Sequence, residues 1–140
     1  MKKRRIALAA HDAKKDILIT LVGKYLSVFQ NASLFATGTT GGRLRETYPN
    51  LDLLCLKSGP LGGDQQIGAI LAEGNLDAMI FFVDPLCPMP HDDDVKALTR
   101  LANVYDLPIA YNVGTAEAIM QSMLLRSDNI KYPCLKAGYH

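Results

Sequence analysis

Short apolar segments alternate with helical patterns along this chain. Five segments have the length and composition of buried strands, and they cover residues 6–10, 34–36, 51–56, 78–83 and 108–111. Between them, apolar residues recur at helical spacing over 17–26, 67–71, 95–105 and 116–124, with a shorter helix expected at 43–48. Strands that alternate with helices are typical of an α/β domain with a parallel sheet and right-handed crossovers. The pattern therefore predicts an α/β fold with a five-stranded parallel sheet.

The length of the chain fits one domain. Its 140 residues are enough to bury a full core, and no repeat, low-complexity segment or linker divides them. We therefore expect residues 1–140 to form a single domain. From about residue 127 onward the sequence shows no clear period, so this tail stays unassigned.

Charge and cysteine content argue against several classes of partner. The formal net charge is only +1, and we interpret the basic run at 2–5 as a solvated lead-in to the first strand. No apolar stretch approaches the length of a membrane span. Cys55, Cys87 and Cys134 show neither the spacing of a disulfide framework nor that of a zinc site. We expect a cytoplasmic protein with reduced thiols that binds neither nucleic acid nor membrane.

Polar residues and glycines gather where predicted strands end. They occur at His11-Asp12, Thr37–Gly42, Ser58–Asp64 and Asp84. In open α/β sheets, ligands bind outside the carboxyl ends of the strands. These four segments therefore predict one ligand site at a single edge of the sheet.

The segment Thr37–Gly42 has the composition of a phosphate-binding loop. Its glycines let the backbone approach an anion, its threonines donate hydrogen bonds, and the following helix N-terminus favours negative charge. It lacks the Gly-Lys-Ser/Thr ending of a Walker loop and the glycine spacing of a dinucleotide fingerprint. A plain turn explains this segment equally well. Lys15, one helical turn beyond His11, is either a surface lysine or a cation for the same anion.

Two further residues are candidates for proton transfer. Asp64 follows two glycines at the start of a helix, where it is either the N-cap or a general base that a ligand approaches closely. His91 lies among carboxylates, of which Asp92 and Asp93 suit a helix N-terminus. No metal-ligand spacing is present. A neutral His91 that polarises a carbonyl or enediolate oxygen therefore fits better than a metal site.

Together these segments resemble the methylglyoxal synthase family. The resemblance covers about residues 6 to 119, and its motifs match the family in order and separation. These motifs are residues 10–12, 36–41, 58–69 and 84–98. The long block at 58–69 is highly specific, whereas the threonine-glycine segment alone would not be. The resemblance implies a three-layer α/β/α fold.

The resemblance also implies a reaction and its site residues. The family converts dihydroxyacetone phosphate to methylglyoxal and inorganic phosphate without metal or organic cofactor. Asp64 matches the acid/base that removes the hydroxymethyl proton to form an enediolate, and His91 matches a histidine that contacts substrate oxygens. Asp12, Asp84 and Asp94 match further active-site aspartates. The positions that match substrate-binding residues, chiefly for its phosphate and hydroxyl groups, are His11, Lys15, Thr37, Gly38, Thr39, Thr40, Ser58 and Gly59.

The partners implied by the resemblance are a small-molecule substrate and copies of the same chain. The family resemblance implies a homohexamer that is inhibited by its product phosphate. The same fold also serves as a non-catalytic, ligand-binding regulatory domain in carbamoyl-phosphate synthetase. A third alternative is a different phosphate-ester lyase or isomerase on the same site. The presence of Asp64, His91 and Asp94 favours the synthase.

Overall fold

Five parallel strands form one sheet, as the sequence predicts. The computed structural model describes residues 3–87 and 92–126. The strands lie in the order β3-β2-β1-β4-β5, and every pairing is parallel. Their bounds are Arg4–Ala10 for β1, Ala32–Thr37 for β2, Asp52–Leu56 for β3, Ala78–Phe82 for β4 and Ile109–Ala110 for β5. The expected α/β fold class is confirmed.

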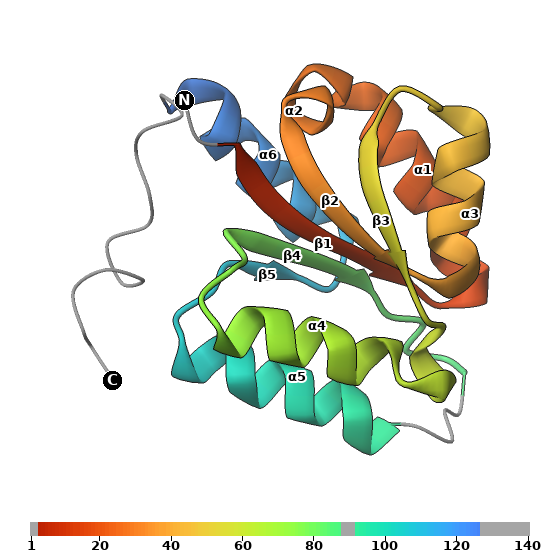
Figure 1. The fold of residues 1–140 in the computed structure, drawn as a ribbon, viewed down its shortest axis with the longest axis vertical. Coiled ribbons are helices and arrows are strands. Elements are labelled where there is room, and N and C mark those ends of the chain that lie inside the picture. The colour runs from red at the N-terminus through yellow and green to blue at the C-terminus, as the bar shows by residue number, and fades with distance from the viewer. Residues whose placement is uncertain (1–2, 88–91, 127–140) are drawn as a thin grey trace.

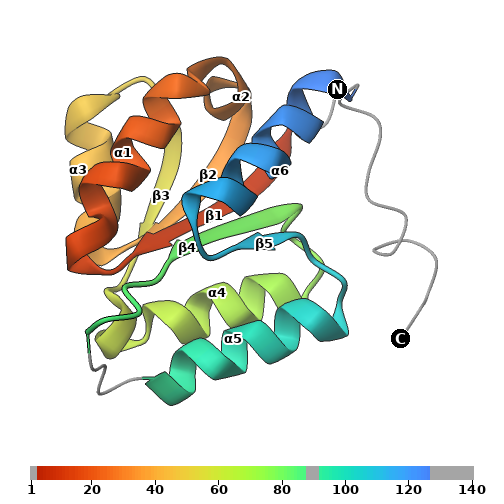
Figure 2. The ribbon, with the colours of Figure 1, turned by 180° about the vertical axis from the view of Figure 1, so that it is seen from behind.

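Helices cover both faces of this sheet and make three layers (Figures 1 and 2). One face carries α1 (Lys15–Lys24), α2 (Leu26–Gln30), α3 (Gly38–Thr47) and α6 (Val113–Leu125). The other face carries α4 (Gly63–Ala72) and α5 (Asp92–Val104). Two short 3-10 helices, η1 (Asp12–Lys14) and η2 (Gly59–Leu61), lead into α1 and α4. None of the helices within the described residues combines the length and the apolar composition that crossing a bilayer requires.

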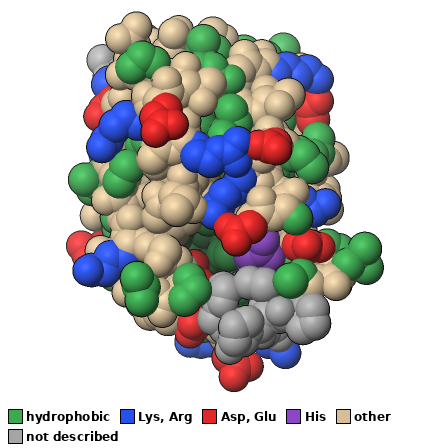
Figure 3. All heavy atoms as spheres, turned by 90° about the vertical axis from the view of Figure 1, so that its right-hand side faces the viewer, with side chains coloured by type: hydrophobic (Ala, Val, Ile, Leu, Met, Phe, Trp, Pro, Cys, Tyr) green, Lys and Arg blue, Asp and Glu red, His purple; other side chains and the backbone are tan. Residues whose placement is uncertain are grey.

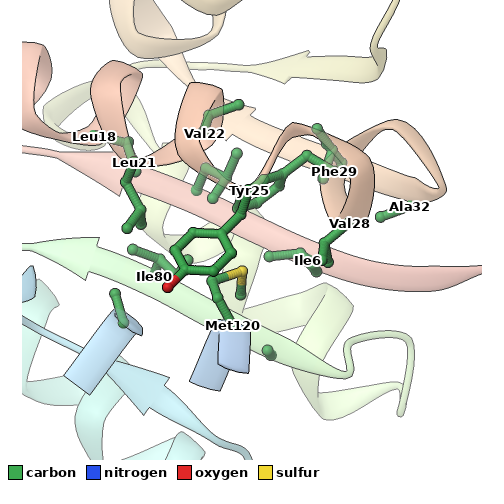
Figure 4. Close-up of a cluster of buried hydrophobic side chains, with 14 of the residues drawn as sticks. Ile6, Leu18, Leu21, Val22, Tyr25, Val28, Phe29, Ala32, Ile80 and Met120 are labelled. Atoms are coloured by element: carbon green, nitrogen blue, oxygen red, sulfur yellow. The ribbon is translucent and has the colours of Figure 1, made fainter. Parts of the chain in front are cut away.

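The alternating side chains of the inner strands supply a core on each face. In β1, Ile6 and Leu8 join the core under α1, α2, α3 and α6, whereas Ala7 and Ala9 join the core under α4 and α5. Figure 4 shows the first core, in which the buried Tyr25 ring lies among side chains from α1, α2, β1, β4 and α6. Its hydroxyl accepts a hydrogen bond from Gln121 Nε2 at 3.1 Å, so its polar atom is satisfied. Both faces of the sheet are therefore packed, and only its ends are open for a site.

The segment Thr37–Gly42 is not the loop that its composition predicts. Thr37 ends β2 and is the N-cap of α3, and the helix begins at Gly38. The helix passes very close to β3, since a Cβ added to Gly41 would lie 2.8 Å from Cys55 Sγ. Close packing against the sheet therefore accounts for one of the glycines, and the threonines lie on a helical first turn.

Candidate active site

A cavity of about 480 Å³ opens at the carboxyl ends of β1, β2, β3 and β4. Figure 3 shows this face of the molecule, where acidic and basic side chains lie beside a histidine. Eleven of the thirteen residues predicted for the site line the cavity: His11, Asp12, Lys15, Thr37, Gly38, Thr39, Thr40, Ser58, Gly59, Asp64 and Asp84. The other two are Asp94, which lies elsewhere, and His91, which is outside the described residues. The segments that follow the four strands therefore line one cavity at the edge of the sheet where the sequence placed them.

One end of the cavity is built to hold an anion. Lys15 Nζ donates hydrogen bonds to Asp12 Oδ1 and Thr39 Oγ1, and only 13% of the Lys15 side chain is exposed. Thr39 and the buried Thr40 belong to the first turn of α3, where backbone N–H groups lack intrahelical acceptors. Gly38 adopts a left-handed φ of 39°, which brings its backbone against Ser58. The ammonium, the hydroxyls and the helix N-terminus all favour a phosphate here.

The contact between Asp12 and Lys15 has a measurable consequence. The hydrogen bond and charge of Lys15 hold the pKa of the Asp12 carboxyl below its ordinary value of 3.8. Because the folded pKa is lowered, the ion pair is complete above pH 3.8 and is lost as the pH falls through the folded pKa. We expect an NMR titration of Asp12 Cγ to give a midpoint below 3.8, and Lys15→Met to return it to about 3.8. An unchanged midpoint in Lys15→Met would contradict this origin of the shift.

Asp64 presents a buried carboxylate to the same cavity. It lies in the first turn of α4 and is only 3% exposed. The N-cap of that helix is Gly62, with a left-handed φ of 109°, so the alternative reading of Asp64 as the N-cap is wrong. Gly59 packs directly on the carboxylate, since a Cβ added there would lie 3.3 Å from both Asp64 oxygens. This packing leaves room beside the carboxylate only because residue 59 is glycine.

His11 has the hydrogen bonding of a neutral imidazole. The backbone N–H of Asp84 donates to His11 Nδ1 at 2.9 Å, so that nitrogen carries a lone pair and the ring proton is on Nε2. The ring is 9% exposed and packs edge-on against Phe81, with centroids 5.4 Å apart. The Asp84 carboxylate accepts a hydrogen bond from Leu86 N–H at 3.1 Å. His11 is therefore fixed as an N–H donor; the sequence predicted it as a substrate-binding residue but assigned the neutral imidazole to His91.

Asp94 lies outside the cavity lining. It accepts a hydrogen bond from Gln65 Nε2 at 2.8 Å and borders a groove between α4 and α5 that Asp64 also borders. Pro60, Phe81 and Cys87 line the cavity although the sequence did not single them out for the site. Among residues 3–87 and 92–126, no group of three or more His, Cys, Asp and Glu side chains is arranged to hold a metal ion. The described site therefore consists of an anion-binding end, a buried carboxylate and a neutral histidine.

Comparisons with known proteins agree on one family. The model of the family described as "MGS-like domain" matches residues 18–111. The chain is 57% identical to the methylglyoxal synthase of Agrobacterium fabrum, covering 84% of this chain and 93% of that one, and 51% identical to that of Brucella ovis, covering 87% and 98%. The crystal structure of methylglyoxal synthase from Elizabethkingia anophelis NUHP1 is similar, with a TM-score of 0.81 and 42% identity over 89% of this chain and 82% of that one.

Proposed function

The chain belongs to the methylglyoxal synthase family, and we propose that it converts dihydroxyacetone phosphate to methylglyoxal and inorganic phosphate. The observation that carries this proposal is the placement of the buried Asp64 carboxylate in one cavity with Lys15 and the threonines of α3. The relatives are enzymes, which favours the lyase over a non-catalytic regulatory domain of the same fold.

In the proposed reaction, Asp64 takes a proton from the hydroxymethyl carbon of the substrate. The electron pair of the broken C–H bond moves toward the carbonyl and gives an enediolate. The former hydroxymethyl carbon then becomes the aldehyde carbonyl, its hydroxyl proton passes to the departing phosphate, and the C–O bond to phosphate on the far carbon breaks. The bonding pair leaves with the phosphate, and the remaining enolate accepts at carbon the proton held by Asp64, which gives methylglyoxal and restores the carboxylate. No oxidant or reductant is consumed.

The orientation of the phosphate selects between elimination and isomerisation. Phosphate leaves readily when its C–O bond stands perpendicular to the enediolate plane, and it is retained when that bond lies in the plane. We propose that Lys15, Thr39 and Thr40 hold the phosphate out of plane and stabilise the charge that develops on it. His11 Nε2–H supplies a donor for a substrate oxygen.

The remaining residues are proposed for the site on the family resemblance. Thr37, Gly38, Ser58 and Gly59 contact the substrate, and their positions around the cavity support this role. Asp12 and Asp84, which also line the cavity, act as further active-site aspartates. Catalytic roles for His91 and Asp94 rest on the resemblance alone, since the first is outside the described residues and the second is outside the cavity lining.

The proposal extends to regulation, assembly and location. The same groups that hold the substrate phosphate would hold free phosphate, so we propose that the product inhibits the enzyme. By the family resemblance we further propose a homohexamer in the cytoplasm.

A single assay tests the proposed reaction. We expect the purified protein, with EDTA present, to release methylglyoxal and inorganic phosphate in equal amounts from dihydroxyacetone phosphate. Heat-denatured protein provides the blank, because the substrate also loses phosphate spontaneously. Glyceraldehyde 3-phosphate as the product would indicate an isomerase, and phosphate without methylglyoxal would indicate a phosphatase. No product above the blank at micromolar enzyme would refute the proposed function.

A further inference from the structure

Two glutamines follow Asp64, and the proposed reaction gives neither of them a role. Gln65 bonds to Asp94, as described above. Gln66 is half-buried in α4, and its side-chain Oε1 accepts a hydrogen bond of 2.8 Å from the backbone N–H of Lys57. Lys57 is the first residue beyond β3, so its N–H lies past the last strand pairing, between Leu56 and Thr37. The Gln66 side chain therefore accepts the hydrogen bond that a neighbouring strand would accept from this N–H.

The backbone at Lys57 and Ser58 joins the first turns of α3 and α4, and both turns contribute residues to the cavity lining. The Lys57 carbonyl accepts a hydrogen bond from Gly38 N–H at 3.2 Å, at the first residue of α3. The Ser58 carbonyl accepts from Leu61 N–H at 3.0 Å and from Gly63 N–H at 2.8 Å, at the first residue of α4. The backbones of Gly38 and Ser58 pack closely, since a Cβ added to Gly38 would lie 2.7 Å from Ser58 Cα. A shift of this short segment would therefore move Ser58 and Gly59 relative to Asp64.

We propose that Gln66 is a positioning residue for the reaction. Its hydrogen bond ties the end of β3 to the same first turn of α4 that carries Asp64, and so it fixes the base against the Ser58–Gly59 backbone. Gly59 lies directly on the Asp64 carboxylate, so a small displacement at Lys57 changes how that carboxylate faces the substrate. Lys15 in α1 donates a hydrogen bond to Thr39 in α3. Phosphate binding by these two side chains does not require the hydrogen bond of Gln66. This inference rests on the proposed function.

Gln66→Met tests the proposal because methionine has a similar length but offers no strong acceptor. We expect kcat with dihydroxyacetone phosphate to fall by about 10- to 100-fold, since misplacement by about 1 Å can cost 100-fold. The dissociation constant of inorganic phosphate should stay within about twofold, because the contact between Lys15 and Thr39 is unchanged. Gln66→Glu keeps an oxygen acceptor and should retain kcat to within about threefold. Gln30→Met, the same substitution on the exposed end of α2, is the matched control and should have no effect.

Two results would overturn the proposal. One is a parental kcat in Gln66→Met, and the other is equal impairment in Gln66→Glu and Gln66→Met. Amide exchange separates this inference from the proposed function and needs no turnover. In the parent protein the backbone N–H of Lys57 should exchange with solvent much more slowly than the N–H of an exposed, unstructured peptide. If it exchanged as fast as such a peptide, the hydrogen bond would be refuted, even if Gln66→Met failed to fold. An inactive parent with a protected Lys57 amide would instead refute the proposed reaction and leave the contact standing.

Discussion

Replacing Asp64 with asparagine is expected to lower kcat for dihydroxyacetone phosphate by about 10²- to 10⁴-fold, the range for loss of a positioned general base. The amide has nearly the shape of the carboxylate but cannot accept a proton at neutral pH. Asp64 is only 3% exposed and lines the cavity, so the substitution removes the proposed proton acceptor without changing the shape of the site. The substitution should therefore lower kcat.

Binding of inorganic phosphate provides the internal control for Asp64→Asn. Lys15 donates a hydrogen bond to Thr39, and Thr40 lies in the same first turn of α3, so the proposed phosphate-binding groups come from α1 and α3 and not from α4. We expect calorimetric titration of phosphate to give a dissociation constant at least as low as that of the parent. Asp52→Asn makes the same substitution on an exposed residue at the opposite end of the sheet and should keep parental kcat. Near-parental turnover in Asp64→Asn would exclude it as the base.

The strand ends could be predicted from sequence because their geometry follows from the fold class. Once β1 to β4 are parallel, the residues after each strand meet at one edge, and this brought His11, Ser58 and Asp84 together as expected. The position of Asp94 could not be predicted in this way, because Asp94 lies on α5 and does not follow the end of a strand. Its observed partner is Gln65, on the neighbouring helix.

Two features depend on contacts that a single sequence does not encode locally. Glycines disfavour helices, so Thr37–Gly42 has the composition of a loop, yet packing of Gly41 against Cys55 lets α3 begin there. The tautomer of His11 is set by a backbone N–H that is 73 positions away, at Asp84. Tertiary packing overrides local propensity in the first case and fixes a proton in the second. Gly62 and Gly63 likewise have a structural role, as the N-cap and the first residue of α4.

Gly63→Ala is expected to be the most destabilising substitution at the edge of the site. An added Cβ would lie 2.0 Å from the Lys57 carbonyl oxygen and 2.9 Å from its carbonyl carbon, and a backbone carbonyl cannot rotate away as a side chain can. Gly63 N–H also donates to the Ser58 carbonyl at 2.8 Å, so relief of the clash breaks this bond as well. We expect the free energy of unfolding to fall by about 3 kcal/mol, at the upper end of the usual cost of overpacking.

Urea denaturation followed by circular dichroism measures this loss, and Gly42→Ala provides the matched control. Gly42 lies within α3, is exposed, and has nothing within 4 Å of an added Cβ. In the control, alanine should raise the free energy of unfolding by up to about 1 kcal/mol, because it replaces glycine inside a helix. Any Gly63→Ala protein that folds should also lose kcat, since the clash separates the first turn of α4, with Asp64, from the end of β3. Parental stability and kcat in Gly63→Ala would show that α4 and β3 are not in the close contact on which the geometry of the base depends.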